Sequence, residues 1–380
     1  QVLRARAELE RFEIVEGDTL RLQPCFSPVW DTALAIQALA CSGDPEHPAL
    51  HRAAAWLLER EVRHSGDWQV KRPRAKPGGW YFEYENEFYP DLDDTAAVIT
   101  ALHHAPGARP AATRAAIERA VEWMLQMQGR DGGWASFDVD NNRLIFTHIP
   151  FADHNAMLDP STADISARTL EMLGLTAGSR EVPPQCRAVI ESAMERAIQF
   201  LRSEQEEDGA WYGRWGVNYI YGTWLALQGL RAASLPADAP ECRRGAAWLR
   251  SVQNPDGGWG ESPASYDVPA LRGPGPSTAS QTAWALLGLM AAEEQNSDAV
   301  ARGVRFLIET QDEDGSWRED QFTGTGFPRV FYLKYHLYRL YFPLMALARY
   351  AAGCRPSAVG CQSDNGALDL TASRQPPADR

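Results

Sequence analysis

The stretch RAVEWMLQMQGRDGGW, from Arg119 to Trp134, joins an amphipathic helix pattern to a polar turn that ends in Gly-Gly-Trp. Its apolar residues recur with the period of a helix that buries one face. The Asp-Gly-Gly sequence then provides a residue that adopts a positive φ angle, which commonly closes a helix. The stretch therefore predicts a surface helix followed by a tight turn that carries a tryptophan.

The same phrase occurs five times along the chain, which indicates a repeat architecture. The five copies end at Trp68, Trp134, Trp211, Trp259 and Trp317. In the last four copies a glutamine stands where the helix ends, namely Gln128, Gln205, Gln253 and Gln311.

A second phrase alternates with the first. Its copies are WDTALAIQAL, DDTAAVITAL, DISARTLEML, YGTWLALQGL and SQTAWALLGL, which begin at Trp30, Asp93, Asp164, Tyr221 and Ser280. A sixth copy around YFPLMALARY fits loosely because Pro343 interrupts it. These helices are apolar nearly all round and should be buried, whereas the first set carries charge on one face and should lie outside.

Alternating inner and outer helices, repeated six times, predict an all-α fold that closes into an α6–α6 barrel, also called an α/α toroid. An open solenoid of helix pairs is the alternative. Closure is favoured because neither end of the chain shows a polar capping repeat.

Composition excludes several classes of protein. The chain of 380 residues has a formal net charge of −13, which disfavours a nucleic-acid partner. Its longest apolar runs are too short to span a bilayer. The six cysteines are scattered without metal-ligand spacing, which favours a reducing cytoplasm and no metal site. The chain opens at Gln1 without a signal peptide, so we expect it to be part of a longer protein.

Three aspartates, Asp91, Asp93 and Asp94, precede an inner helix within the motif DLDDTA. In the repeat alignment Asp94 shares a column with Asp31, so it is predicted to cap the helix N-terminus. Asp93 shares the preceding column with Trp30, Asp164, Tyr221 and Ser280. Because the inner helices run in one direction, these side chains should meet at one mouth of the barrel.

An aspartate at a helix start is more often a cap than a catalyst. Three aspartates within four residues repel one another, however. Capping a helix requires only one of them, so capping does not explain why this unfavourable repulsion is present. At least one should keep its proton near neutral pH. Arg168 lies one turn after Asp164, and it either pairs with Asp164 or points at the three aspartates.

Aromatic residues are dense in the segments that lead into the inner helices, as in GGWYFEYENEFYP and TGTGFPRVFYLKYHLYRLYFP. Such residues usually form core, but here they alternate with glycine in connecting loops. Each aromatic face stabilises a cation by roughly 0.5–2 kcal/mol. A carboxylic acid beside an aromatic wall suits chemistry that generates carbocations.

Three motifs together resemble the squalene–hopene cyclases, the bacterial class II triterpene cyclases. They are DLDDTA, the Gln…Gly-x-Trp phrases (the QW repeats of that family) and DGAWYGRWGVNYIYG, in which Ala210 replaces a usual serine. The resemblance covers roughly residues 26–350. It implies a C-terminal catalytic barrel over residues 26–352 and a connecting segment over residues 1–25 from a preceding domain. Beyond about Cys354 the composition turns to Pro, Ser, Ala and Asp, which predicts a disordered tail over residues 353–380.

By this resemblance Asp93 is the general acid, and Asp91 and Asp94 support its protonation. Asp164 and Arg168 tune the acid, and Tyr221 joins its hydrogen-bond network. Aromatic positions that line the cavity are matched by Trp30, Phe82, Phe137, Trp215, Phe327, Phe331, Tyr335 and Tyr338. The segment HIPFADH, residues 148–154, resembles the family's channel constriction but departs from it at Ala152 and His154.

The resemblance implies an isomerase that protonates squalene and cyclises it to hopene or hopanol without a cofactor. It also implies a peripheral protein on the cytoplasmic side of the bacterial inner membrane, held there by the preceding domain, with a homodimer as a further expectation.

Several alternatives stay open at this point. They are another class II cyclase acting on a diterpenyl or other polyprenyl substrate, a binding scaffold without catalysis, and a carbohydrate-active toroid enzyme that uses Asp93 and Asp164 as its two acids. A prenyl-protein transferase subunit is disfavoured, because no cysteine falls at the tip of an inner helix.

Overall fold

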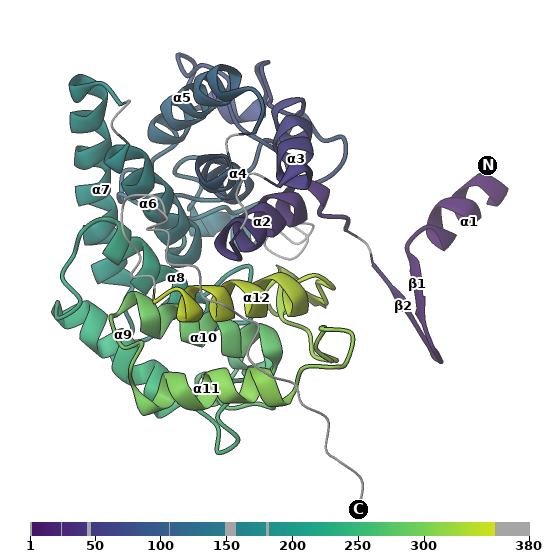
Figure 1. Ribbon diagram of the computed structural model, residues 1–380. Helices are drawn as coiled ribbons and strands as arrows, with labels where there is room; N and C mark the ends of the chain where they lie inside the picture. The colour runs from purple at the N-terminus through teal and green to yellow at the C-terminus, as the bar shows by residue number, and fades with distance from the viewer. Residues whose placement is uncertain are drawn as a thin grey trace, which may run out of the picture.

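The computed structural model describes residues 2–23, 25–43, 47–105, 107–148, 157–179 and 182–353. Its main body is a ring of inner helices (Figure 1), namely α2 (Pro28–Cys41), α4 (Leu92–His104), α6 (Ala163–Gly178), α8 (Tyr219–Ala232), α10 (Ala279–Ala291) and α12 (Tyr338–Ala351). Each inner helix contacts the next, and α12 contacts α2. This last contact closes the ring, so the predicted toroid is confirmed and the open solenoid is excluded.

The outer helices surround this ring. They are α3 (Pro48–Leu58), α5 (Pro110–Gln126), α7 (Pro184–Glu204), α9 (Pro240–Ser251) and α11 (Asp298–Glu309). Within the described chain no outer helix follows α12, so five of the six predicted inner–outer pairs are complete there.

Burial separates the two layers as the sequence pattern predicts. Every residue of the inner helix α10 is buried. The outer helix α11 buries one stripe that contains Val300, Val304 and Leu307, and it exposes the rest. The apolar residues of both layers form one continuous core.

The repeated tryptophan joins an outer helix to an inner one. Trp134 donates from its indole Nε1 to the carbonyl of Met124, 2.8 Å away, near the end of its own helix α5. Its backbone N–H donates to Ser166 Oγ on the inner helix α6, also at 2.8 Å. The same two bonds recur at Trp211, with Leu201 and Thr223, and at Trp259, with Leu249 and Thr282.

The repeated glutamine links neighbouring outer helices. Gln128 donates from Nε2 to the carbonyl of Gly132 in its own turn, at 2.8 Å, and to the carbonyl of Ala193 in α7, at 2.9 Å. Its Oε1 accepts a bond from Arg196. Gly132 has a φ angle of 92°, which confirms the positive φ predicted for this turn. The phrase therefore holds together three helices with a few side chains.

The prediction that Trp68 ends the first copy of this phrase is wrong. Trp80 makes the characteristic bonds instead, from Nε1 to the carbonyl of Leu57 at 2.7 Å and from its backbone to Thr95 Oγ1 at 2.9 Å. Trp80 stands 23 residues after its carbonyl partner, compared with 10 residues for Trp134. The first copy thus contains an insertion, and Trp68 lies within it, edge-on to Trp123.

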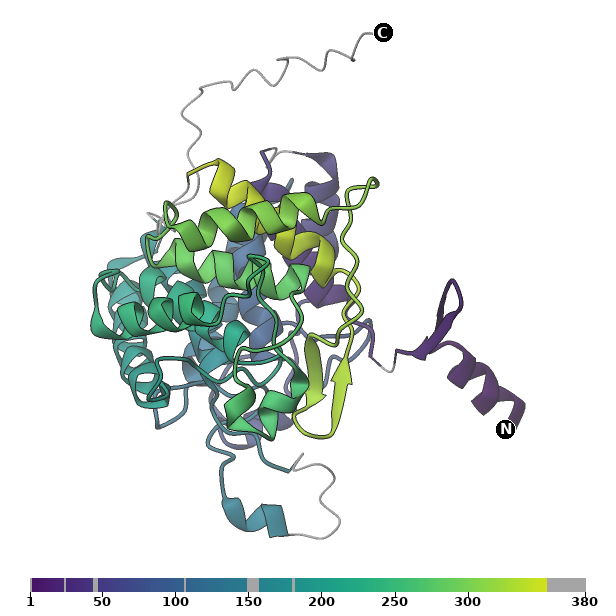
Figure 2. The ribbon, with the colours of Figure 1, turned by 90° about the horizontal axis from the view of Figure 1, so that it is seen from below.

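Smaller elements lie outside the helical ring. The helix α1 (Val2–Glu10) and the antiparallel strands β1 (Glu13–Glu16) and β2 (Thr19–Leu22) form an arm that projects from the barrel (Figure 1). A second hairpin, β3 (Gly324–Phe327) and β4 (Phe331–Leu333), lies with long loops at one end of the barrel (Figure 2). These loops carry the 3₁₀ helices η1 (Asp67–Val70), η2 (Leu144–His148), η4 (Pro263–Tyr266) and η5 (Pro269–Leu271).

The predicted division into connecting segment, barrel and tail stays a prediction, and the tail after Gly353 lies outside the described residues. Across the described residues, we find no helix with the length and apolar character needed to cross a membrane.

Replacing Gln128 with alanine should lower the free energy of unfolding by about 1–3 kcal/mol, because two carbonyl groups lose a buried donor. Gln126→Ala is the matched control, since the Gln126 side chain donates only to Glu122 of its own helix. Guanidinium unfolding curves measure both values. Equal curves for the two variants would show that the glutamine link contributes nothing to stability.

Candidate active site

The acid motif lies at the start of the inner helix α4. Asp91 caps this helix, because its Oδ1 accepts the backbone N–H groups of Asp93, at 2.6 Å, and of Asp94, at 3.1 Å. The prediction that Asp94 is the cap is therefore wrong. The helix begins at Leu92, so Asp93 and Asp94 already belong to its first turn, and their side chains do not cap it.

Arg168 connects three inner helices at this mouth of the barrel. Its Nε donates to Asp93 Oδ1 on α4 at 2.6 Å, and its terminal nitrogen donates to the hydroxyl of Tyr221 on α8 at 2.8 Å. Arg168 is 4% exposed and Asp93 is 8% exposed. Of the two predicted arrangements, the arginine has the one that points at the aspartates.

Asp164 instead organises a neighbouring loop. Its Oδ2 accepts the backbone N–H groups of Arg214, at 2.7 Å, and of Trp215, at 3.0 Å. Its Oδ1 accepts bonds from Thr162 Oγ1 and from the N–H of Ile165. Four donors therefore surround this carboxylate, and two of them fix the backbone of the loop at Arg214 and Trp215.

Five residues share the alignment column of Asp93, and four of them lie together at the mouth of the barrel. These four are Trp30, Asp93, Asp164 and Tyr221. Trp30 on α2 lies with its ring centre 4.8 Å from the Arg168 guanidinium, beside Asp93 and Tyr221. Ser280 differs, because its hydroxyl donates to Glu319 at 2.8 Å and completes a local cap of α10.

Burial makes the three aspartates weak acids. It raises the pKa of Asp91 to about 8, with the negative charge of Asp93 as the second cause. Burial also raises the pKa of Asp94 well above its usual value, with the charges of Asp91 and Asp93 adding to the effect. For Asp93 burial raises the pKa, while the positive charge of Arg168 opposes the rise. The cluster can therefore hold protons at neutral pH.

Aromatic rings adjoin the buried contact between Asp93 and Arg168. Tyr335 and Tyr338 stack with ring centres 4.5 Å apart, and Phe82 meets Tyr335 edge-on at 6.4 Å. Trp30 donates from Nε1 to the hydroxyl of Tyr338 at 3.1 Å. Deeper in the barrel, Trp284 lies against Tyr221 at 4.9 Å. The predicted Trp30, Phe82, Tyr335 and Tyr338 thus form one aromatic wall beside the acid.

The other predicted aromatic positions lie farther out in the loops. Phe327 and Phe331 contact each other across the β3–β4 hairpin, with ring centres 5.8 Å apart, and both are half-buried. Trp215 donates from Nε1 to Ser136 Oγ at 3.0 Å. Phe137 is 36% exposed and lines a small separate cavity of about 250 Å³ with Trp68. Of the predicted channel constriction, residues 149–154 lie outside the described residues.

Two functional candidates were missed by the sequence reasoning. Asp31 accepts bonds from Ser27 Oγ at 2.7 Å and from the Tyr341 hydroxyl at 3.2 Å, and burial raises its pKa to about 6. Asp31 occupies the same position as Asp94 in the alignment of the inner-helix repeats, and this could have identified it from the sequence. Asp159 accepts three backbone N–H groups, those of residues 136–138, and so fixes the loop of Phe137. Nothing in the motif pattern distinguished Asp159.

No cluster of three or more histidine, cysteine, aspartate or glutamate side chains within the described ranges is arranged to hold a metal ion. Each buried carboxylate named above is bonded to protein donors or to Arg168, apart from Asp94, whose Oδ1 has no hydrogen-bond partner among the described residues.

Residues 26–352 match the family model of the squalene-hopene cyclase C-terminal domain. The chain belongs to the squalene–hopene cyclase family. It is 48% identical over 360 residues to the squalene–hopene cyclase of Zymomonas mobilis, a match that covers 91% of this chain and 53% of that protein. It is 45% identical over 373 residues to dammaradiene synthase of Dryopteris crassirhizoma, a match that covers 94% of this chain and 54% of that protein.

A solved structure with a similar fold is the ent-copalyl diphosphate synthase of Streptomyces platensis, with a TM-score of 0.55 and 21% identity. That match covers 86% of this chain and 50% of that chain. At this identity the likeness concerns the fold alone. The chain spans about half the length of the curated relatives it matches.

The stability of the family domain should depend on pH through Asp91. An aspartate in the unfolded chain has a pKa near 3.9, whereas folded Asp91 keeps its proton up to about pH 8. The folded state therefore binds more protons between about pH 4 and pH 8, and its stability falls as the pH rises through that window. Asp91→Asn, which still caps the helix, should lose less stability between pH 5 and pH 8 than the wild type. Guanidinium midpoints at both pH values measure this difference.

Asp238→Asn serves as the control for this experiment, because Asp238 is exposed and distant from the cluster in sequence. If Asp91→Asn and Asp238→Asn showed the same pH dependence, the Asp91 carboxyl would not be the proton-holding group.

Proposed function

We propose that this chain is the catalytic half of a class II terpene cyclase that protonates squalene and cyclises it to a pentacyclic hopanoid, hopene or hopanol. The observation that supports this most directly is the buried contact of Asp93 with Arg168, 2.6 Å long, beside an aromatic wall. A carboxylic acid in this position can keep its proton and still be stabilised once the proton has left.

The reaction begins with a proton transfer from Asp93. Oδ1 accepts the bond from Arg168, so Oδ2 is the oxygen that would carry the proton. The π electrons of a terminal squalene double bond form the new C–H bond, and a tertiary cation results at the adjacent carbon. Successive double bonds then attack the cation and close the rings. Loss of a proton from the final cation gives hopene, and capture of water followed by loss of a proton gives hopanol, so either ending yields a neutral product.

Electrostatics explain how Asp93 can hold its proton in the resting protein and still transfer it to an alkene. An ordinary aspartic acid, with a pKa near 3.9, would lose its proton to water before it met an alkene. Burial raises the pKa of Asp93 and so favours its protonated form, while the positive charge of Arg168 opposes the rise. As the carboxylate forms, its bond to the Arg168 guanidinium becomes charge-assisted on both sides and stronger. Because Arg168 is already in place, little reorganisation is needed at the moment of transfer.

The aromatic wall suits the later steps. The rings of Trp30, Phe82 and Tyr335 present π faces that attract a nearby cation, at roughly 0.5–2 kcal/mol for each desolvated contact. Burial raises the pKa of Tyr338 well above its usual value, so its hydroxyl stays neutral and is a poor nucleophile toward the cation.

The other enzyme classes have less support. A carbohydrate-active enzyme would need Asp93 and Asp164 as two available acids, but Asp164 is bonded to four donors and Asp93 to Arg168. Another class II cyclase with a different polyprenyl substrate shares the acid geometry. Hopanoid formation is favoured over it by the 48% identity to a squalene–hopene cyclase.

We also propose that the whole protein acts as a peripheral membrane protein at the cytoplasmic face of the bacterial inner membrane, and that it forms a homodimer. The support for membrane association is chemical: squalene has no polar group and partitions into lipid. The proposed roles of the individual site residues rest on the contacts described above.

Asp93→Asn should abolish turnover in the full-length protein while the fold is retained. Asparagine has no acidic proton, but its amide oxygen can still accept the bond from Arg168. Squalene conversion is measured by gas chromatography with mass spectrometry, and the fold by circular dichroism. Asp238→Asn is the control and should convert squalene at the wild-type rate. Cyclic products from a folded Asp93→Asn variant would refute the assignment of the acid.

Arg168→Gln should lower kcat by about 10²–10³-fold, because the forming carboxylate loses its preorganised cation. KM should change little, since Arg168 contacts the acid. Arg168→Lys should recover only part of the rate, because one ammonium cannot reproduce the fork that reaches both Asp93 and Tyr221. Steady-state kinetics with squalene measure all three proteins. An unchanged kcat in Arg168→Gln would show that the arginine only holds the helices together.

A further inference from the structure

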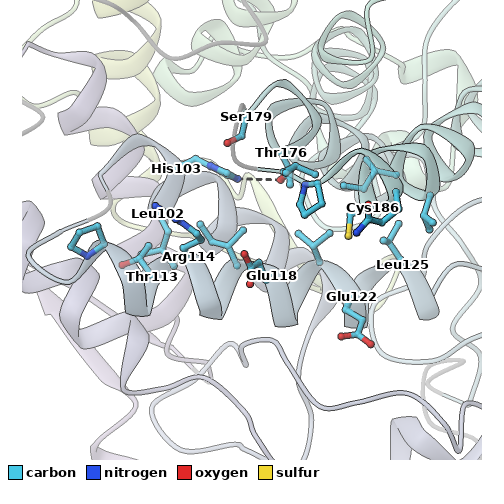
Figure 3. Close-up of a pocket in the computed structure, with 18 residues that line it drawn as sticks. Leu102, His103, Thr113, Arg114, Glu118, Glu122, Leu125, Thr176, Ser179 and Cys186 are labelled. Atoms are coloured by element: carbon cyan, nitrogen blue, oxygen red, sulfur yellow. Dashed lines mark hydrogen bonds between the residues drawn. The ribbon is translucent and has the colours of Figure 1, made fainter.

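A larger cavity lies at the opposite end of the helices that carry the acid. It encloses about 800 Å³ between the outer helices α5 and α7, and the C-terminal residues of α4 and α6 form its floor (Figure 3). Asp93 lies in the first turn of α4 and His103 in its last turn, ten residues later, which corresponds to about 15 Å along the helix. This cavity is therefore distinct from the site around Asp93.

Aliphatic side chains form most of the surface of this cavity. Ile117 and Val121 of α5 face it from one side, Val189 and Ile190 of α7 from the other, and Leu102 of α4 from below. Val189 is 57% exposed, so the cavity opens to the surface along α7. Its volume falls within the range of small-molecule sites, about 300–1,000 Å³. An apolar hollow of this size at a surface usually marks a binding site.

The interior of the cavity carries no charge at neutral pH. Its floor contains His103, whose Nε2 is hydrogen-bonded to Thr176 Oγ1 at 3.1 Å (Figure 3). Burial lowers the pKa of His103 to about 4, so the imidazole is neutral. The side chain of Thr113 donates to the carbonyl of Arg109 at 3.1 Å. These polar groups are thus already engaged within the protein.

The charged residues stand at the exposed edge of α5. Glu118 and Glu122 lie along this edge, with Arg114 one turn before them (Figure 3). Glu122 is also paired with Lys76, whose Nζ lies 3.2 Å from its Oε1, so two carboxylates and two cations leave no excess positive charge to attract the head group of a fatty acid or an anionic phospholipid. The cavity is therefore complementary to a ligand that is aliphatic throughout and uncharged.

We propose that this cavity binds an uncharged isoprenoid hydrocarbon of the squalene class, as a second site remote from the acid. The choice of ligand rests on the proposed function, since that function supplies the hydrocarbon. The site holds substrate or product between α5 and α7, outside the ring of inner helices. Because α4 and α6 contribute to both sites, a ligand here contacts the far ends of the helices that carry Asp93 and Arg168.

Photo-crosslinking in the full-length protein tests this proposal. The probe is a squalene analogue that carries a diazirine group, applied to Asp93→Asn protein so that it is not turned over. Labelled peptides are mapped by mass spectrometry. We expect label in peptides from α5 and α7 as well as in peptides from the acid mouth. Val189→Trp, which fills the cavity, should reduce the α5 and α7 label at least fivefold and leave the mouth label unchanged.

Ile308→Trp on α11 is the matched control, because Ile308 is 61% exposed on an outer helix and does not line the cavity. It should leave all labelling unchanged.

Absence of label from α5 and α7, or label there that survives Val189→Trp, would overturn the proposal. Stronger labelling of these helices by a diazirine-bearing phospholipid would also overturn it, because the ligand would then be an acyl chain. A change of oligomeric state in Val189→Trp, seen by light scattering, would identify the cavity as a protein interface instead. Label at α5 and α7 with none at the acid mouth would contradict the proposed function while leaving this second site in place.

Discussion

Arg168 reaches across the barrel mouth from α6, to Asp93 at the start of α4 and to Tyr221 at the start of α8. A guanidinium buried this deeply is costly unless it is fully paired. Loss of either partner, Asp93 or Tyr221, would leave the guanidinium incompletely paired. The contact therefore fixes the relative positions of α4, α6 and α8 at the mouth. The same contact lowers the pKa of Asp93 against the effect of burial. Under the proposed function, structure and reactivity at this site therefore both depend on one side chain.

The surrounding carboxylates divide into two groups by their hydrogen bonds. Asp164, Asp159 and Glu261 each accept backbone N–H groups from a loop or a helix start, so they stabilise the backbone that shapes the mouth. Asp93 and Asp94 accept no backbone N–H bond among those described, and Asp94 Oδ1 has no partner at all among the described residues. The backbone bonds oppose, without cancelling, the rise that burial gives to the pKa of Asp159 and to the pKa of Glu261, which lies at about 7. Asp93 and Asp94 lack backbone N–H bonds and lie beside other buried acids, which favours their protonated forms. Under the proposed function, this difference separates the reactive acid from the carboxylates that hold the backbone in place.

The repeat itself was enough to predict the fold. Periodicity separated inner from outer helices, and the glycine turns located the ends of the outer ones. Errors arose where the repeat is interrupted. The insertion between Leu57 and Trp80 moved the first tryptophan, and a column alignment could not show that α4 begins at Leu92, which makes Asp91 the cap. The partner of Arg168 could not be predicted either, because a sequence alignment does not show whether its side chain turns along its own helix α6 or toward the neighbouring helices α4 and α8. Asp159 follows no repeat and acts through backbone N–H groups, which leave no trace in side-chain identity.

The two ends of the barrel differ in the kind of ligand they can stabilise. The N-terminal mouth of α4 and α6 combines acids, a guanidinium and aromatic faces, so it can create a cation and attract it. The C-terminal end of the same helices meets aliphatic side chains and a neutral His103, which offer no stabilisation to charge. A hydrocarbon bound there gains only from leaving water. Under the proposed function, carbocation chemistry is therefore confined to one end of the inner helices by the side chains themselves, and the other end can hold the same class of molecule without reacting with it.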